Sequence, residues 1–213
     1  MILHGYWRSS SSWRVRIGFA LKALDYDYRA VHLVEGGGKQ HSEEYRAKNP
    51  MRQVPMLEWE ENGEQIYLTQ SLAILEFLDE LRPTPAILPA NRVHRAWSRE
   101  MAEVINAGTQ PLQNLAVIQK IKAETDLDAK AWCRDWIERG LSAYELLAER
   151  RAGTYSVGDE VSLADICLIP QLYNARRFDV DLEAFPTILG IEERCNALEA
   201  FQLSHPDQQP DAP

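Results

Sequence analysis

Several features that would assign this 213-residue chain to a class of proteins are scarce or missing. Its three cysteines, Cys133, Cys167 and Cys195, are odd in number, widely spaced and without a CxxC or Cys/His cluster. We therefore expect reduced, mostly buried thiols, no disulfide framework and no metal. No apolar run approaches the ~20 residues of a membrane span, and no signal-peptide pattern opens the sequence. These absences predict a cytoplasmic protein with no membrane partner.

Positively charged residues are fewer than negatively charged ones. Lysine and arginine total 23 residues against 32 aspartates and glutamates, which gives a net charge of −9. A nucleic-acid partner is not expected, because general nucleic-acid binding needs a basic face. The glycines at 36–38 form neither a GxGxxG motif nor a P-loop, so a nucleotide site has no support. A hydrophobic content of 45% is ample for one or two packed domains.

Strand and helix patterns alternate over the first eighty residues, and helical patterns follow from about residue 90. Strands are predicted at 1–5, 28–33, 56–59 and 66–68, with a hairpin turn at 61–64. Helices are predicted from the serines at 9–12, over 71–81, near 92–121 and 127–150, and from Ser162, where Asp165 completes a capping box. Prolines 83, 85 and 89 indicate a linker over 83–91. We therefore predict an α/β domain over 1–82 and an all-helical domain over 92–213 that ends in a polar tail.

The most informative segment is the cluster of serines and arginines between the first strand and the first helix. It reads Tyr-Trp-Arg-Ser-Ser-Ser-Ser-Trp-Arg-Val-Arg over residues 6–16. The first backbone N–H groups of a helix lack partners inside the helix, so hydroxyl and guanidinium groups gathered there can receive a thiolate or a carboxylate. The plainer alternative is an ordinary N-cap followed by solvated arginines.

Two shorter motifs could also bind a ligand. The proline of Val54-Pro55 precedes a strand and could form a cis turn that leaves the Val54 N–H and C=O free for an extended peptide, although a trans turn is the common alternative. Ser71 of Gln70-Ser71 opens a helix, where its hydroxyl and N–H could hold a carboxylate or serve only as an N-cap. Gln40 and the glycines before it would by default form a surface turn.

Together these motifs resemble those of the zeta-class glutathione transferases over almost the full length of the chain. The resemblance implies a thioredoxin-like amino-terminal domain that binds glutathione, an all-helical carboxy-terminal domain and a homodimer. By matching position, the resemblance implies that Ser9 and Ser10 are the catalytic residues. The blocks that carry the resemblance are residues 8–17, 49–55, 70–74, 110–114, 157–165 and 198–202.

The resemblance also implies a set of binding residues. Arg8 and Arg177 would hold the carboxylates of a small dicarboxylate substrate, and the neighbouring Arg176 is the better candidate for a surface residue. The residues implied to contact glutathione are Ser9, Ser10, Ser11, Ser12, Trp13, Arg14, Gln40, Val54, Pro55, Gln70, Ser71, Gln110 and Asn114.

The activity that the resemblance implies is the glutathione-dependent cis–trans isomerisation of maleylacetoacetate to fumarylacetoacetate, in the breakdown of tyrosine and phenylalanine through homogentisate. The glutathione thiolate would add to the cis double bond, permit rotation and leave again, so glutathione would be recycled. A serine is too weak a base to deprotonate the thiol, and its role would be to donate a hydrogen bond to the thiolate.

Two positions depart from close relatives. Ser11 stands where members that isomerise maleylacetoacetate commonly carry cysteine, and we expect activity to survive this change. Leu115 and Ala116 stand where members that isomerise maleylpyruvate carry arginines, which favours maleylacetoacetate. The alternatives are maleylpyruvate isomerisation, transfer or dehalogenation of α-halo acids, and, more distantly, a noncatalytic partner-binding role on the same fold. The histidines show no ligand spacing and are expected to be structural.

Overall fold

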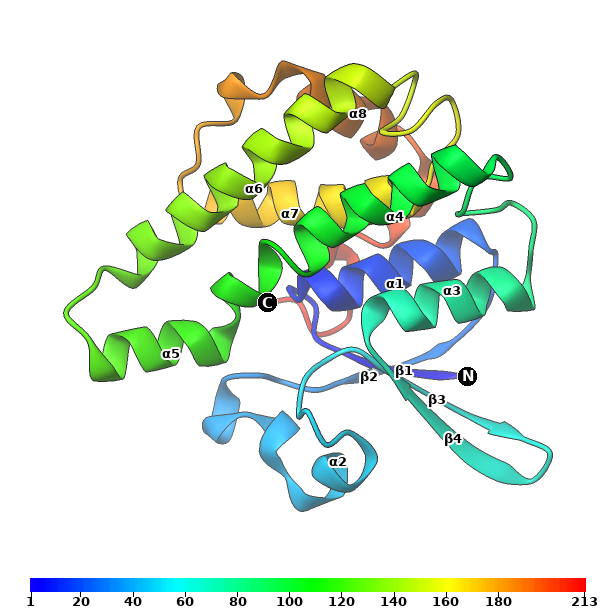
Figure 1. Cartoon of the computed structure of the whole chain (residues 1–213). Coiled ribbons are helices and arrows are strands. Elements are labelled where there is room, and N and C mark those ends of the chain that lie inside the picture. The colour runs from blue at the N-terminus through cyan, green and yellow to red at the C-terminus, as the bar shows by residue number, and fades with distance from the viewer. The chain divides into compact units, whose positions relative to one another are not determined.

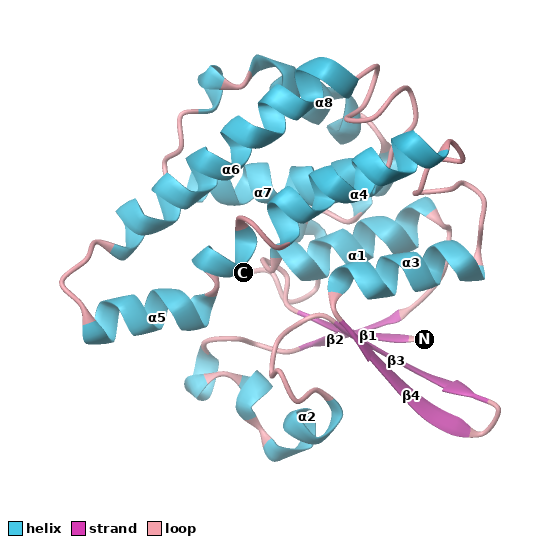
Figure 2. Ribbon diagram, viewed as in Figure 1, coloured by secondary structure: helices cyan, strands magenta, loops and turns pink.

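The computed structural model describes residues 1–213 as two compact units. Unit 1 comprises Met1–Pro85 together with Glu199–Pro213, and unit 2 comprises Ala86–Leu198. Figure 1 follows the chain through both units by colour, and Figure 2 separates their helices from their strands. The sheet belongs entirely to unit 1, and unit 2 is helical.

Unit 1 is built on a four-stranded sheet in the order β2-β1-β3-β4. β1 and β2 are parallel, as expected for strands joined by a crossover helix, and β1–β3 and β3–β4 are antiparallel. The strands are β1 Ile2–Gly5, β2 Asp27–Ala30, β3 Met56–Glu61 and β4 Glu64–Thr69. The helices are α1 Ser10–Leu21, α2 Glu43–Lys48 and α3 Ser71–Leu81, with short 3₁₀ turns η1 Glu35–Gly37 and η2 Lys39–His41.

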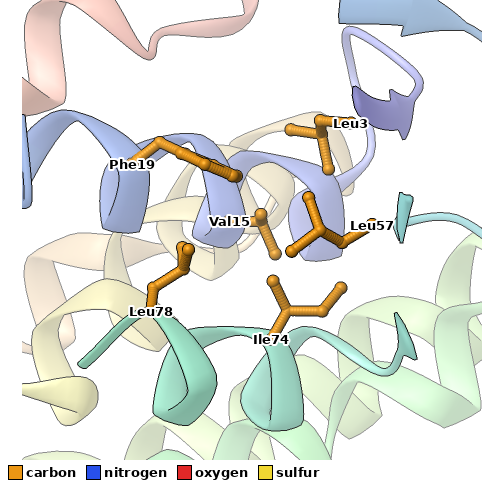
Figure 3. Packing of buried hydrophobic residues seen from close by; sticks show 6 residues of the cluster. All are labelled: Leu3, Val15, Phe19, Leu57, Ile74 and Leu78. Carbon is orange, nitrogen blue, oxygen red and sulfur yellow. The ribbon is translucent and has the colours of Figure 1, made fainter. Parts of the chain in front are cut away.

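The two faces of this sheet carry different helices. Leu3 of β1 pairs in register with Leu57 of β3, and both leucines pack against α1 and α3. Met56, one residue away, belongs to the opposite cluster with Tyr45 of α2 and Val31, as the two-residue period of a strand requires. Figure 3 shows the buried members of the first cluster, which lie between the sheet and the helices α1 and α3. Its fully buried members are Leu3, Val15, Phe19, Leu57, Ile74 and Leu78.

A buried polar cluster joins α2 to the sheet. His4 Nε2 lies 2.7 Å from Glu58 Oε2, and Lys48 Nζ, at the end of α2, lies 3.3 Å from the same oxygen. Burial lowers the pKa of His4, although the hydrogen bond to Glu58 opposes this. Burial acts to raise the pKa of Glu58, but the hydrogen bonds from His4 and Lys48 outweigh it and the net shift is downward. Both shifts favour the state with neutral His4 and ionised Glu58.

This cluster predicts that acid destabilises the protein through His4. A histidine whose folded pKa lies below its ordinary 6.5 contributes stability that is present above pH 6.5 and is lost as the pH falls through the folded value. Between about pH 7 and about pH 5 the unfolding free energy should therefore fall more in the wild type than in His4→Gln, which keeps an amide donor for Glu58. Chemical denaturation at several pH values measures this difference. The exposed His41, as His41→Gln, is the control, and equal pH profiles for wild type and His4→Gln would contradict the prediction.

Residues 199–213 complete unit 1, although the sequence analysis assigned them to the helical domain and to a tail. They contain α9 Glu199–Leu203 and the turn η5 Pro206–Gln208. The fully buried Arg16 donates to the carbonyl oxygens of Ser204 at 3.0 Å and Trp7 at 2.9 Å. The Asp211 carboxylate accepts from the Trp7 N–H at 3.0 Å and the Tyr28 hydroxyl at 3.2 Å. These bonds place the segment with unit 1, because a buried guanidinium needs carbonyl partners to offset its lost hydration.

Unit 2 is arranged around α7, Leu163–Arg177, in which every residue from Leu163 to Leu172 is buried. α7 packs against α4, α6 and α8. No helix of the chain is both long enough and apolar enough to cross a membrane. The remaining elements of unit 2 are α4 Arg92–Asn106, η3 Gln110–Gln113, α5 Leu115–Glu124, α6 Ala129–Arg151, η4 Leu182–Ala184 and α8 Pro186–Asn196.

The structure corrects two of the predicted elements. The strand expected at 28–33 ends at Ala30, because His32 Nδ1 accepts from the N–H groups of Val34 and Glu35 and turns the chain. The helix expected near 92–121 is interrupted between Asn106 and Leu115. Pro111, which has no N–H to donate, lies in the short η3 turn at this break.

Candidate functional site

The serine cluster forms the start of α1, as predicted. Ser9 is the N-cap, and its Oγ accepts a hydrogen bond from the Ser12 N–H at 3.2 Å. The first turn holds no acidic side chain, so the positive end of the helix dipole is not neutralised there. Ser9, Ser10 and Ser11 are half-buried, whereas Ser12 is fully buried and accepts from the Tyr6 N–H at 3.4 Å. The first three serines are therefore the partly exposed members of the cluster.

Trp13 and Arg14 are directed into the protein, which overturns the alternative of solvated arginines. Trp13 is buried, and its Nε1 donates to Ser204 Oγ at 3.1 Å. Arg14 is fully buried, and its Nη1 donates to Ser71 Oγ at 3.3 Å. Ser71 is the first residue of α3, so this bond ties the start of α1 to the start of α3. Two helix N-termini, each a favourable place for an anion, are held together in one unit.

The residue before α3 has an unusual backbone. Gln70 has φ 72° and ψ 116°, and neither its side chain nor any other caps the first turn of α3. A positive φ is uncommon for a residue with a Cβ and is unfavourable unless its surroundings impose it. The Gln70 side chain is exposed and Ser71 is buried. The chain thus holds Gln70 in this conformation beside an uncapped helix N-terminus.

The loop before β3 presents an unpaired extended residue. Asn49 Nδ2 and the Tyr45 hydroxyl donate to the Gln53 carbonyl at 2.6 Å and 2.7 Å, which fixes the loop. The next residue, Val54, has no hydrogen bond from its N–H or to its C=O within the chain. The Val54–Pro55 peptide bond is cis, the less common of the two alternatives considered. The open N–H and C=O groups of Val54 are available to an extended peptide.

Gln40 is buried rather than on a surface turn. Its Nε2 donates to the Leu33 carbonyl at 3.2 Å, and its Oε1 has no partner. Gly38 before it has φ 97°, and an added Cβ would lie 2.5 Å from the Gln40 amide and 2.7 Å from the Leu33 carbonyl. A glycine is required here for both reasons. The buried Oε1 is therefore a hydrogen-bond acceptor that has no donor within the chain.

The other predicted site residues are divided between the two units. Arg8 is half-buried in unit 1, with its Cζ 5.4 Å from the centre of the Trp7 ring. Gln110, Asn114 and Arg177 belong to unit 2. Gln110 opens η3, and Asn114 is the N-cap of α5 without a capping bond from its side chain.

The two adjacent arginines of α7 are distinguished by their partners. Arg176 Nη1 and Nη2 each lie 2.6 Å from an oxygen of Glu192, a bidentate pair that raises the pKa of Arg176. Arg177 is exposed, and its Nη1 donates to Asn174 Oδ1 at 2.7 Å. The expectation that Arg176 is a surface residue agrees with its exposure, and its guanidinium is engaged by Glu192.

Sequence reasoning missed two polar residues beside Arg177, namely Gln113 and Asn174. They lie in η3 and α7 and are buried in unit 2. The available signal was the pair Gln171 and Asn174, two amides three residues apart in an otherwise apolar helical pattern. Amides at such spacing share a helix face, and an apolar setting makes each of them need a partner.

No group of three or more His, Cys, Asp or Glu side chains could hold a metal ion. The three cysteines are free thiols and are buried, as expected. His4 and His32 are engaged in structural hydrogen bonds, and the His205 ring packs edge-on against Trp13.

Comparison with known proteins identifies the family. Residues 8–81 match the glutathione S-transferase N-terminal domain and residues 115–199 match the C-terminal domain. The maleylacetoacetate isomerase of Mus musculus is 47% identical over 212 residues, which cover 100% of this chain and 95% of the mouse protein.

Solved structures of similar proteins agree with this assignment. The maleylacetoacetate isomerase of Anaeromyxobacter dehalogenans 2CP-1, with bound GSH in the active site, is 50% identical, with a TM-score of 0.92 over 100% of this chain and 97% of that one. A second structure of that protein holds dicarboxyethyl glutathione and citrate, at 50% identity and a TM-score of 0.90 over 100% and 93% of the two chains. A holo maleylpyruvate isomerase, described as a bacterial zeta-class glutathione S-transferase, is 38% identical, with a TM-score of 0.93 over the full length of both chains. This chain therefore belongs to the glutathione S-transferase family, in its zeta class.

Proposed function

We propose that this protein is a glutathione-dependent isomerase that converts maleylacetoacetate into fumarylacetoacetate. The observation that carries the proposal is the Arg14–Ser71 hydrogen bond, which holds the serine-rich start of α1 beside the uncapped start of α3. This arrangement offers one helix N-terminus to a thiolate and another to a carboxylate. The maleylacetoacetate isomerases that share 47% to 50% of its residues over nearly full length support the same activity.

The residues of unit 1 fit glutathione, whose γ-glutamyl carboxylate, cysteinyl amide and thiol need three different receptors. Gln70, Ser71 and the first turn of α3 would hold the carboxylate. The open N–H and C=O groups of Val54 would pair with the cysteinyl main chain. Ser9 and Ser10 would donate to the sulfur, and Gln40 Oε1 offers an acceptor to a ligand N–H. Gln110 and Asn114 remain proposed contacts from unit 2.

When bound, glutathione supplies the nucleophilic thiolate that makes the substrate double bond able to rotate. The protein's part is to keep that sulfur ionised and the substrate oriented. A free thiol with a pKa near ~8.5 is mostly protonated at neutral pH, and each unit by which the pKa falls corresponds to ~1.4 kcal/mol. Hydroxyl donors at a helix N-terminus provide such stabilisation. Arg8 and Arg177 would bind the carboxylates of the substrate.

Removing the Ser9 hydroxyl should raise the pKa of the bound glutathione thiol. We expect Ser9→Ala and Ser10→Ala each to lower kcat/KM by ~10-fold or more, since one lost donor to an anion costs roughly 1.5–3 kcal/mol. The thiolate absorbance of bound glutathione, followed against pH, measures the shift. Ser9→Gly separates the two roles of Ser9, because glycine preserves most of the N-cap and lacks the hydroxyl. If Ser9→Ala raises the thiol pKa and Ser9→Gly does not, capping rather than donation is responsible.

A coupled assay tests the proposed function directly. Maleylacetoacetate is supplied with a small amount of glutathione and a hydrolase that accepts only the trans product. Turnover well beyond the glutathione supplied is the expected result, because glutathione is recycled. Maleylpyruvate and an α-halo acid, assayed in parallel, separate the alternatives: faster conversion of maleylpyruvate would reassign the substrate, and released halide would indicate transfer. A preparation that binds glutathione but converts neither maleyl substrate contradicts the proposal.

We infer a homodimer in the cytoplasm, acting in the homogentisate route of aromatic amino-acid breakdown. We also infer a glutathione-binding domain over 1–82 and a helical domain from residue 92 onward, whose last residues, 199–213, are part of unit 1. The family resemblance supports each of these, and the free buried thiols are typical of a reducing compartment. Light scattering after size-exclusion chromatography would measure the oligomeric state, and a monomer at micromolar concentration would contradict the dimer.

A further inference from the structure

Four polar side chains of unit 2 form a hydrogen-bonded row that ends at Arg177. Arg177 Nη1 donates to Asn174 Oδ1 at 2.7 Å, and Asn174 Nδ2 donates in turn to Gln113 Oε1. Gln113 Nε2 then donates to Gln171 Oε1 at 2.9 Å. The three amides are buried, with exposed fractions of 8% for Asn174, 6% for Gln113 and 0% for Gln171. We call these three amides and Arg177 the amide row.

The direction of the amide row is fixed by its charged end. A guanidinium has only donors, so Asn174 must present its oxygen to Arg177 and its NH₂ group to Gln113. Gln113 must then accept with its oxygen and donate with its NH₂ group to Gln171. The last amide is left with a buried Nε2 that has no partner. A buried amide nitrogen without an acceptor is unfavourable. Its presence at Gln171 therefore indicates that the order of the amide row is set by the Asn174 oxygen, which accepts from Arg177.

The amide row joins two elements, because Gln113 of η3 lies between two amides of α7. Asn174 and Arg177 are three residues apart on α7, and Gln113 is the last residue of η3. η3 is fixed by α6, because Trp132 Nε1 donates to the Leu112 carbonyl at 2.9 Å. The Arg177 side chain is exposed, and long exposed side chains sample many rotamers. A buried acceptor anchored through η3 restricts that freedom and holds the guanidinium in one direction.

We propose that Asn174 and Gln113 are positioning residues that orient Arg177 toward the distal carboxylate of the substrate. The proposal rests on the proposed function in one respect, the role of Arg177 as a carboxylate receptor. A guanidinium held in one orientation can engage a carboxylate through two parallel N–H groups, whereas a freely rotating one cannot do so without losing entropy. Asn174 and Gln113 thereby favour dicarboxylates, although neither residue needs to touch the substrate.

Nitrogen-15 NMR of the arginine side chains tests the positioning without any catalytic readout. In the wild type we expect separate, slowly exchanging Nη signals for Arg177, and in Asn174→Ala and Gln113→Leu we expect them to merge. Arg176, held by Glu192, is the internal control and should not change. Gln113→Glu keeps an acceptor for Asn174 and lets the Gln171 amide turn its free donor toward the new carboxylate, so it should preserve the Arg177 signals. Unchanged Arg177 signals in Asn174→Ala would overturn the proposal.

Calorimetric measurement of malonate binding to the glutathione-saturated protein tests whether the amide row contributes to recognition of a dicarboxylate. We expect the malonate Kd to rise ~10-fold in Asn174→Ala, equivalent to ~1.4 kcal/mol, and to rise no further when this change is added to Arg177→Ala. A merely structural role would give independent, additive effects instead, and that result would overturn the proposal. If Arg177→Ala alone leaves the malonate Kd and the KM for maleylacetoacetate unchanged, the carboxylate-receptor role fails, and the NMR result still decides whether the row positions Arg177.

Discussion

Replacing Arg177 by alanine should lower kcat/KM for maleylacetoacetate by about one to two orders of magnitude. Losing hydrogen bonds to a charged group costs roughly 1.5–3 kcal/mol, and each 1.4 kcal/mol is about tenfold. The loss should appear mainly in the KM for maleylacetoacetate, with the KM for glutathione unchanged, because Arg177 is assigned to the substrate. Arg177→Lys should fall in between, since an ammonium keeps the charge but lacks the planar fork.

The neighbouring arginine provides the matched control. Arg176 is paired bidentately with Glu192, so Arg176→Ala should change kcat/KM less than threefold. Its effect should be a modest loss of stability, at most about 1 kcal/mol for a partly exposed ion pair. Steady-state kinetics and urea denaturation of both variants measure the two quantities. Equal catalytic losses in the two variants would show that general positive charge, rather than the Arg177 guanidinium, matters.

Replacing Asp165 should give the largest loss of stability in the chain. This fully buried carboxylate accepts from the N–H groups of Ser156 and Ser162, both at 2.8 Å, and from the Ser162 hydroxyl at 3.1 Å. It closes the capping box at the start of α7, around which unit 2 is packed. Asp165→Ala leaves these donors buried without an acceptor and should cost roughly 3–5 kcal/mol. Urea denaturation measures the loss.

Asparagine should not rescue this position. Each carboxylate oxygen of Asp165 accepts from a different backbone N–H, but an amide has only one acceptor oxygen. At least one N–H group is therefore left unsatisfied in Asp165→Asn, at about 1–3 kcal/mol. Asp159→Ala is the control, because Asp159 also accepts from a backbone N–H, that of Thr154, but is exposed. Near-wild-type stability of Asp165→Asn would show that the charge and the second acceptor are dispensable.

Local chemistry was enough to predict the elements that have strong local signals. α3 lies over Ser71–Leu81 as expected, where apolar residues recur with helical spacing. The hairpin between β3 and β4 turns at Asn62 and Gly63, whose φ angles of 53° and 81° suit these two residue types. Asp165 and Ser162 close the predicted capping box. In each case a few adjacent residues determine the geometry.

Features decided by distant partners were not predictable. One alternative for the serine and arginine cluster was that its arginines are solvated, yet Arg14 and Arg16 are fully buried, because Ser71 and Ser204 supply acceptors from far along the chain. The unusual φ of Gln70 and the amide row likewise depend on tertiary neighbours. The residue types of the candidate site, and the choice of Arg177 over Arg176, came from the resemblance. The physical reason that sets Arg176 apart is its pair with Glu192, sixteen positions beyond it, which the sequence does not reveal.

The membership of residues 199–213 in unit 1 bears on the order in which the chain can fold during synthesis. Unit 2 is continuous along the chain, from Ala86 to Leu198, and can complete its core as soon as that stretch has left the ribosome. Unit 1 begins first, but the hydrogen bonds of Arg16 and Trp13 to Ser204 can form only after unit 2 has been made. The segment with the candidate glutathione site is therefore translated early and gains these contacts last.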